Sequence, residues 1–161
     1  MDISIKAFSA EMGAGVINLI LPIQQQEFGV NIGFADQPDL NDIPGFYQQG
    51  AGGFWVAQDG DRTIGTIALI DIDGGVGALR KMFVGADYRG GERGIASTLL
   101  KTLLDHARAE GLSRIILGTT PVMAGAHRFY EKNGFQEITI DELPESFPVM
   151  AVDKRFYRLM L

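Results

Sequence analysis

Glycines and arginines gather in one short stretch, Tyr88-Arg89-Gly90-Gly91-Glu92-Arg93-Gly94-Ile95-Ala96, between an expected strand at 79–84 and an amphipathic segment at 94–110. A strand, a glycine-rich turn and a helix start are typical of an anion site, because the first N–H groups of a helix lack partners and its dipole favours negative charge. Glycine lets the backbone approach a ligand, and arginine offers a fork of donors suited to phosphate. The stretch therefore predicts a phosphate site, although a plain turn with solvated arginines would have the same composition.

Basic residues are distributed unevenly along the chain. No lysine or arginine occurs between Lys6 and Arg62, whereas four fall within residues 80–93. The net charge is −6, which argues against a general nucleic-acid binder because such proteins carry a basic surplus. Two common phosphate motifs do not fit the stretch: its glycine spacing differs from the dinucleotide fingerprint, and the Gly-Lys-Ser/Thr of a P-loop is missing.

Two segments of the chain resemble the GCN5-related N-acetyltransferases (GNAT). Gly94-Ile95-Ala96 resembles the second half of that family's Arg/Gln-x-x-Gly-x-Gly/Ala turn, and Tyr88-Arg89-Gly90 resembles its aromatic-Arg-Gly start. The segment from Ala126 to Phe135, Ala-His-Arg-Phe-Tyr-Glu-Lys-Asn-Gly-Phe, is similar to the family's Ala-x-x-Phe-Tyr-x-x-x-Gly-Phe helix. The chain departs from the family in that Arg89 lies two positions further from Gly94 than in Arg-x-x-Gly, so Arg93 could share the work of Arg89.

The resemblance implies an N-acetyltransferase that uses acetyl-coenzyme A as cosubstrate, without a metal. It implies that the backbone of Met82, Phe83 and Val84 pairs with the pantetheine arm, and that Tyr130 is the general acid that protonates the leaving sulfur. A tyrosine hydroxyl that only anchors the cofactor is the alternative. The pyrophosphate would lie on the turn, at Arg89, Gly90, Gly91, Arg93, Gly94, Ile95 and Ala96. Asn133 could reach the cofactor, but it is equally placed to cap its helix, and we favour the cap.

The acceptor is expected to be a small-molecule or peptide amine, and its general base stays undetermined. His127 is a candidate base at neutral pH, but a single histidine on such a helix is more often structural. The stretch from Ala7 to Asp61 carries acidic residues, among them Asp36, Asp39 and Asp42, and no basic ones. If it borders the acceptor, it would attract a cationic amine; otherwise it is a solvated loop. Two other classes stay open: a coenzyme A sensor without turnover, and a non-catalytic interaction domain.

Hydrophobic periodicity around the glycine-rich stretch predicts an α/β fold, with a mixed sheet of about seven strands and helices on both faces. An antiparallel meander comes first, and parallel strands follow the long helix. The expected strands are 4–8, 54–57, 62–72, 76–84, 114–117, 135–140 and 155–161, and the expected helices start after Ser9, at 94 and near 123. The first helix would end near Pro22 or continue to Phe28, and 29–53 would be largely irregular.

Length and composition bound the remaining expectations. The 161 residues predict one domain, residues 1–161, and the resemblance implies that this domain is acetyltransferase-like. The chain has no cysteine and two histidines, so a thiolate metal site and a site of several histidines are excluded. No apolar run approaches the ~20 residues of a membrane span, and the start lacks the pattern of a signal peptide. We therefore expect a cytoplasmic protein without nucleic-acid or membrane partners, and leave open whether it forms a homodimer.

Overall fold

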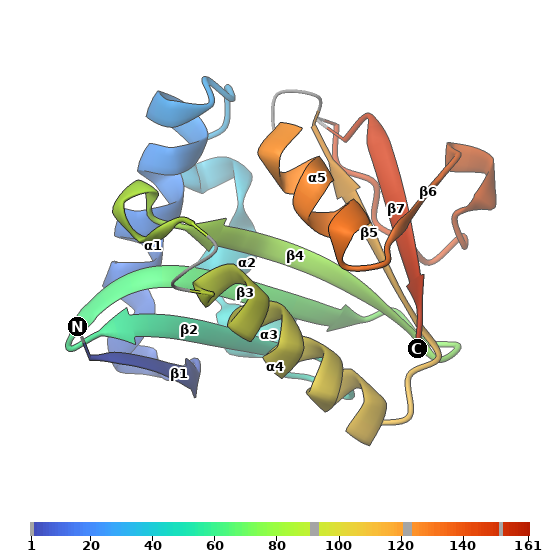
Figure 1. The fold of residues 1–161 in the computed structure, drawn as a ribbon, viewed down its shortest axis with the longest axis horizontal. Helices are drawn as coiled ribbons and strands as arrows, with labels where there is room; N and C mark the ends of the chain where they lie inside the picture. Colours follow the sequence, from blue (N-terminus) through green and yellow to red (C-terminus); the bar gives the residue numbers. More distant parts are fainter. Residues whose placement is uncertain (1, 91–93, 121–123, 152) are drawn as a thin grey trace.

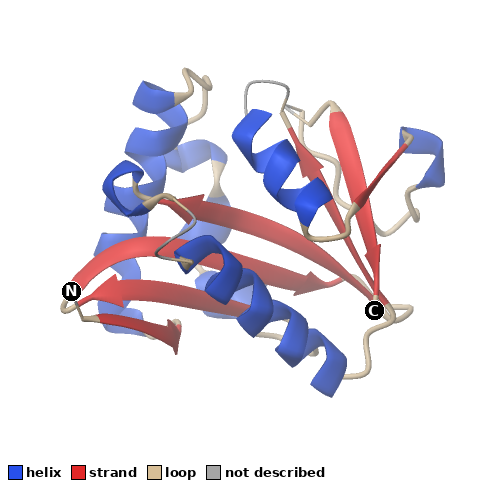
Figure 2. Cartoon of the chain, in the orientation of Figure 1, coloured by secondary structure: helices blue, strands red, loops and turns tan. Residues whose placement is uncertain are grey.

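The computed structural model describes residues 2–90, 94–120, 124–151 and 153–161. In this part of the chain, seven strands form one sheet in the order β1-β2-β3-β4-β5-β7-β6. Their bounds are β1 Ile3–Ala7, β2 Gly53–Asp59, β3 Arg62–Asp71, β4 Val76–Val84, β5 Arg114–Thr119, β6 Gln136–Ile138 and β7 Arg155–Met160. The predicted mixed α/β sheet is thereby confirmed (Figure 2).

Strands β1 to β4 pair antiparallel in chain order, as expected of a meander. The helix that follows β4 carries the chain back across the sheet, so β5 runs parallel to β4. Parallel pairing among the described residues is limited to this pair, because β7 enters between β5 and β6 and runs antiparallel to both. The sequence did not indicate this insertion, which depends on the return of the chain after the connection 139–154.

Helices cover both faces of the sheet. The longer ones are α1 Gly13–Pro22, α4 Ile95–Ala109 and α5 Ala124–Lys132, and the short ones are α2 Pro38–Asn41 and α3 Ile43–Phe46. Helices α4 and α5 share a core cluster on one face, whereas α1, α2 and α3 share another on the opposite face. In Figure 1, α4 lies in front of the sheet and α2 and α3 lie behind it. None of the described helices combines the length and apolar character that a membrane crossing requires.

A proline sets the end of the first helix. Pro22 is its last residue, and because proline lacks an N–H group it cannot extend the regular helical ladder. The next turn, η2 Ile23–Glu27, widens so that the N–H of Phe28 donates to the carbonyl of Ile23 over 3.1 Å. Both expected endpoints therefore describe part of the result, a regular helix to Pro22 and a wider turn beyond it.

The hydrogen bonds between β4 and β5 end early. The last paired residues are Ala78 and Ile116, yet β4 continues to Val84 and β5 to Thr119. Figure 1 shows the two strands meeting near their starts and diverging toward their ends. Among the described strands, the second half of β4 therefore pairs with β3 on one edge and with none on the other.

A β-bulge lies in the divergent half of β4. Arg80 pairs with Ala68 and Phe83 with Thr66, so two residues of β4, Lys81 and Met82, oppose a single residue of β3. Lys81 has a φ of 52°, which non-glycine residues seldom adopt. The hydroxyl of Thr66 donates to the Lys81 carbonyl over 2.7 Å and holds the bulged backbone.

A buried polar cluster holds the side chain of Lys81, which is 6% exposed. The Lys81 ammonium lies 3.4 Å from the Asp39 carboxylate and donates to Gln37, and Tyr47 donates to Asp39. Gln37 and Gln24 exchange amide hydrogen bonds of 2.9 and 3.1 Å. Burial lowers the pKa of Lys81, and the charge of Asp39 opposes that effect. The cluster ties α2, α3 and η2 to the bulge.

We predict that Asp39→Ala destabilises the protein strongly, because it leaves the Lys81 ammonium buried without its counterion. Removal of one partner of a buried pair costs about 3–5 kcal/mol. Urea unfolding of Asp39→Ala should show that loss, and the double variant Asp39→Leu/Lys81→Met should regain much of it. Asp61→Ala, at an exposed hairpin, is the control and should stay within about 0.5 kcal/mol of the unmodified protein. If Asp39→Ala matched that control, the pair would not stabilise the bulge.

Candidate active site

A cavity of about 650 Å³ lies where β4 leaves β5. Its walls come from the wide turn after α1, the end of β4, the turn that follows it, the start of α4 and the inner side of α5. The lining residues predicted from the sequence are Met82, Phe83, Val84, Arg89, Gly90, Gly94, Ile95, Ala96, Tyr130 and Asn133. Gly91 and Arg93 lie outside the described residues. The structure thus brings the described candidates to one cavity.

The open edge of β4 forms one wall of this cavity. Met82, Phe83 and Val84 follow the last β4–β5 pair, so their backbone groups on that edge have no strand partner in the part of the chain that the structure describes. An exposed edge of this kind can pair with an extended chain that carries amide groups. This wall is therefore suited to an elongated ligand with amides.

The start of α4 forms another wall. Gly94 precedes the helix with a φ of 62° and a ψ of 22°, a left-handed conformation that suits glycine. No side chain in the described residues caps this end, and Ile95, Ala96 and Ser97 line the cavity together with Gly94. The N–H groups at a helix start and the helix dipole both favour an anion here.

Arg89 lies at the cavity and is held by three contacts. Its guanidinium forms a bidentate ion pair with the Glu27 carboxylate, with 2.8 Å between Nη2 and Oε1. Its Nε donates to the Val84 carbonyl over 2.8 Å. The guanidinium carbon lies 5.9 Å from the centre of the Phe28 ring. Glu27 and Phe28 come from the wide turn after Pro22 and were not singled out in the sequence, because sixty-two positions separate Glu27 from Arg89. Arg89, which is the candidate for phosphate binding, thus joins that turn to the end of β4.

Tyr130 lies on the side of α5 that faces the cavity and is 6% exposed. Its ring packs against Phe129, Phe135 and Tyr157. Burial raises the pKa of its phenol above the ordinary value, so the hydroxyl keeps its proton at neutral pH. Among the described residues, no group forms a hydrogen bond with that hydroxyl, so it can donate to a ligand.

The end of α5 fixes the position of Tyr130. Gly134 has a φ of 91°, and the N–H of Phe135 donates to the Tyr130 carbonyl over 3.0 Å. The N–H of Gly134 donates to Glu131 over 3.2 Å, which completes the usual glycine helix stop. The Asn133 side chain lines the cavity, but its amide donates to the Phe129 carbonyl over 2.8 Å, so it caps the helix.

His127 serves a structural purpose. It is 4% exposed, with Nε2 2.8 Å from the Thr120 carbonyl and Nδ1 2.9 Å from an Arg155 nitrogen. A carbonyl can only accept and a guanidinium can only donate, so Nε2 carries the proton and Nδ1 offers its lone pair to Arg155. Arg155 also pairs with Glu137 over 2.9 and 3.0 Å. Both ring nitrogens are thus engaged by other groups of the protein, which favours the structural interpretation of His127 over the candidate base.

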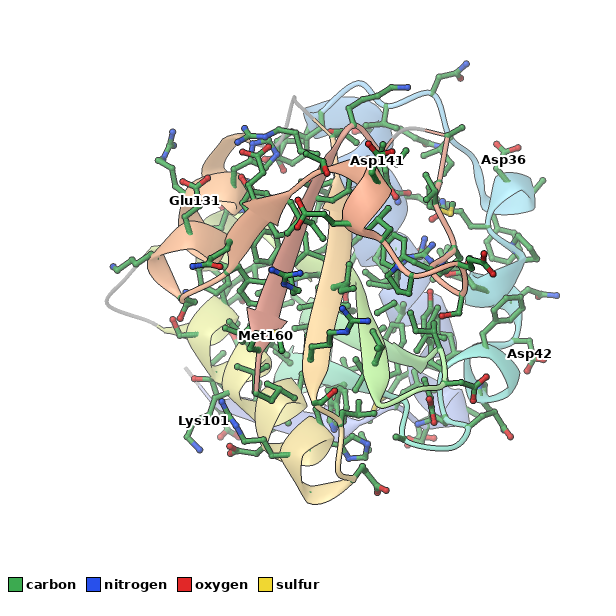
Figure 3. The ribbon with its side chains drawn as sticks, turned by 90° about the vertical axis from the view of Figure 1, so that its right-hand side faces the viewer. Asp36, Asp42, Lys101, Glu131, Asp141 and Met160 are labelled. Carbon is green, nitrogen blue, oxygen red and sulfur yellow. The ribbon has the colours of Figure 1, made fainter. Side chains whose placement is uncertain are left out.

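The carboxylates of Asp36, Asp39 and Asp42, in the acidic stretch, each bind a neighbouring group of the protein. Asp36 accepts from the N–H of Gly33 over 2.9 Å, and Asp42 accepts from that of Gly45 over 3.1 Å. Figure 3 shows Asp36 and Asp42 at the periphery of the molecule. Asp39 is buried against Lys81. The three carboxylates therefore do not form one negative surface, and the hypothesis that together they attract a cationic acceptor loses its basis.

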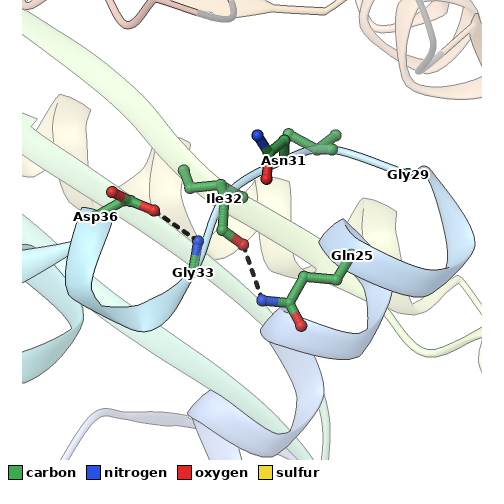
Figure 4. A pocket seen from close by; sticks show the side chains of 7 residues that line it. Gln25, Gly29, Asn31, Ile32, Gly33 and Asp36 are labelled. Carbon is green, nitrogen blue, oxygen red and sulfur yellow. Dashed lines mark hydrogen bonds between the residues drawn. The ribbon is translucent and has the colours of Figure 1, made fainter.

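A second hollow of about 550 Å³ lies beside the loop 29–33. Figure 4 shows that its polar groups bind one another, because Gln25 donates to the Ile32 carbonyl and Asp36 accepts from Gly33. Within the described ranges, no group of three or more histidine, aspartate or glutamate side chains could hold a metal ion. The cavity beside β4 is accordingly the better candidate site.

Comparisons with known proteins agree on one family. The family model described as "Acetyltransferase (GNAT) family" matches residues 17–135. An N-acetylaspartate synthetase from Xenopus tropicalis is 37% identical over 106 residues, which are 65% of this chain and 38% of that protein. The chain thus spans well under half the length of this curated relative.

Two solved structures match almost the whole chain. An acetyltransferase of the GNAT family from Staphylococcus aureus Mu50 is 38% identical with a TM-score of 0.94, and the match covers 98% of both chains. An acetyltransferase from Streptococcus agalactiae is 32% identical with a TM-score of 0.95, and the match covers 100% of this chain and 99% of that one.

We predict that Arg89 and Glu27 respond oppositely to substitution. If Arg89 contacts a ligand phosphate, Arg89→Ala should weaken coenzyme A binding tenfold or more, because a hydrogen bond to a charged group contributes about 1.5–3 kcal/mol. Glu27→Ala is the matched variant: it removes the same pair but leaves the guanidinium in place, so affinity should be kept or increased. Titration calorimetry measures both. Equal losses in the two variants would mean that Arg89 only holds the turn.

Proposed function

Because this chain belongs to the acetyltransferase (GNAT) family, we propose that it transfers the acetyl group of acetyl-coenzyme A to an amine. One observation carries the proposal: a single cavity joins an unpaired strand edge, an uncapped helix start and a buried tyrosine hydroxyl. These three features correspond to amides, phosphates and a leaving sulfur in one elongated ligand.

We propose that the cofactor lies along β4 in the direction opposite to the chain. Its pyrophosphate would bind at Gly94–Ala96 and the turn before it, the part that includes Gly91 and Arg93. The pantetheine amides would pair with the backbone of Met82, Phe83 and Val84. A ligand that follows the strand backward from the turn then reaches the bulge at Lys81 with its acetyl end. The direction follows from the order of these elements, because the anion site comes after the strand.

Acetyl-coenzyme A supplies a thioester whose carbonyl carbon forms a bond with the amine nitrogen while the bond to sulfur breaks. Tyr130 would give its proton to the sulfur that leaves as a thiol, and the proton lost by the amine nitrogen would return Tyr130 to its neutral form. A phenol suits this role because it is a neutral donor, and burial makes its own ionisation harder.

The remaining expectations about the whole protein stay proposals. The acceptor is an amine on a small molecule or peptide, and a cytoplasmic location follows from the cysteine-free composition rather than from the structure. A homodimer stays a prediction. The sensor alternative differs in one observable property, since a sensor would bind coenzyme A without turnover.

Thiol release tests the proposed activity. Acetyl-coenzyme A is incubated with the protein and a panel of amines, and free coenzyme A is measured with a thiol reagent. Release that depends on the amine supports transfer. Tight coenzyme A binding by calorimetry, without release on any amine, would favour the sensor instead.

We predict that Tyr130→Phe lowers kcat by 10²–10⁴-fold, the usual contribution of a general acid. The ring and its packing are kept, so the dissociation constant of coenzyme A should change little. Tyr157→Phe is the control. Tyr157 lies on strand β7, and its hydroxyl donates to the Glu131 carboxylate over 2.8 Å. An unchanged kcat in Tyr130→Phe would reduce this residue to an anchor of the cofactor.

A further inference from the structure

Arg80 and Gly118 occupy matched positions on the two diverging strands. In the β4–β5 ladder, Val76 is paired with Arg114 at one end and Ala78 with Ile116 at the other. Continued by two residues, the same register would set Arg80 opposite Gly118, but the strands have already separated there. The two residues therefore border the place where β4 and β5 begin to separate, which we call the opening.

Arg80 points to the face that carries α1, α2 and α3. It is paired with Ala68, whose side chain belongs to the core cluster of that face, and its charge acts on Tyr47, which directly follows α3. The side chain is half-buried, and no ion pair or hydrogen bond to it occurs within the described residues. The neighbouring Lys81 is already paired with Asp39. Arg80 is thus a guanidinium on this face that can take an anionic ligand.

Asp153 lies over Gly118 on the other strand. A Cβ atom added to Gly118 would come within 2.6 Å of the Asp153 carboxylate, so the missing side chain leaves the space that Asp153 fills. Gly118 follows Ile116 by two residues and faces the same core cluster as Ala78, on the face to which Arg80 points. The carboxylate accepts from the Met150 N–H over 3.1 Å and feels the charges of Arg80 and Lys81 without forming an ion pair with either. Burial raises its pKa.

The pair lies across the sheet from the cavity that would hold the cofactor. Met82 and Val84 pack toward the α4 face, whereas Arg80 and Asp153 lie on the opposite face of the same opening. Lys81, where the acetyl end of the ligand would arrive, lies next to Arg80 in the chain. An acceptor held between Arg80 and Asp153 would therefore approach the acetyl group through the opening.

We propose that this opening is the acceptor site and that it takes a small amine bearing a carboxylate, with the carboxylate on Arg80 and the ammonium on Asp153. A guanidinium and a carboxylate that interact electrostatically but form no ion pair within the described residues match the opposite charges of an amino acid. The proposal rests on the proposed function for its reaction. In the reaction the ammonium first gives one proton to Asp153, which frees the lone pair of its nitrogen. The nitrogen then forms the bond to the acetyl carbon while the carbon–sulfur bond breaks, and the sulfur takes its proton from Tyr130. The second proton of the nitrogen returns to Tyr130 through solvent, so that coenzyme A leaves as the free thiol.

Matched acceptors test the proposal through turnover. Glycine, β-alanine and L-aspartate are compared with glycinamide, β-alaninamide and aspartate diamide, which keep the amine and remove the free carboxylates. We expect kcat/KM for each acid to exceed that of its amide at least tenfold, because a site built for a charged group rejects an analogue that lacks it. In Arg80→Met that preference should disappear through a rise in KM for the acids, while coenzyme A binding stays unchanged.

Arg114→Met is the matched control. Arg114 is also a half-buried arginine on the same face, but it lies at the paired end of the β4–β5 ladder, away from the opening. This variant should keep the preference for acids. Asp153→Asn, which retains an oxygen for the Met150 N–H, should lower kcat/KM for acids and amides alike, since both contain the amine.

A binding measurement separates this proposal from the proposed function. The acids and amides are titrated into protein saturated with coenzyme A, and their dissociation constants are measured by calorimetry. Tighter binding of the acids that is lost in Arg80→Met supports the acceptor site even if no acetyl transfer occurs. Equal binding and equal turnover of acids and amides would overturn it while leaving acetyl transfer intact, and so would an equal loss in Arg80→Met and Arg114→Met.

Discussion

The molecule depends on an interruption in one pair of strands. Three residue pairs join β4 to β5, and the strands then diverge although both continue. Backbone groups left open in this way must find another partner, since an unpaired buried amide is costly. The fold accepts that cost only where a ligand or water can reach the edge. The open edge of β4 beside the cavity is therefore the feature around which the other site residues are arranged.

Two supports hold β4 in its divergent course. On the α1 side, the cluster around Lys81 ties the bulge to α2 and η2 through buried polar contacts. On the cavity side, Arg89 joins the end of β4 to η2 through Val84 and Glu27. Both supports meet the wide turn that follows Pro22. The exposed Arg89–Glu27 pair by itself contributes little to the free energy of unfolding. Its effect is to orient the Arg89 guanidinium at the cavity.

The sequence allowed prediction of those features that depend on a local pattern or on a specific motif. Periodicity gave the strands and the long helix, and the resemblance gave Tyr130 and the turn that ends at Ala96. Contacts between distant segments left no local signal, as with Glu27 and Arg89, or Asp39 and Lys81. The insertion of β7 between β5 and β6 was missed for the same reason. Arg80 and Lys81 were counted among the basic residues that gather at the phosphate turn, and this interpretation was wrong. The structure places Lys81 against Asp39, and Arg80 on the same face, away from the cavity beside the turn.

The bulge also decides which ligand meets which face. Side chains alternate along a regular strand, so Met82 and Val84 would share the face of Ala78 and Arg80 if no residue were inserted. Because Lys81 and Met82 together oppose one residue of β3, the alternation shifts, and Met82 and Val84 pack toward α4 while Phe83 packs toward α1. One extra residue thus reverses the alternation, so that Arg80 and Met82, two positions apart, lie on opposite faces of the sheet. Arg80 is left facing one side of the opening and the cavity wall faces the other, an arrangement in which two ligands can meet through the sheet.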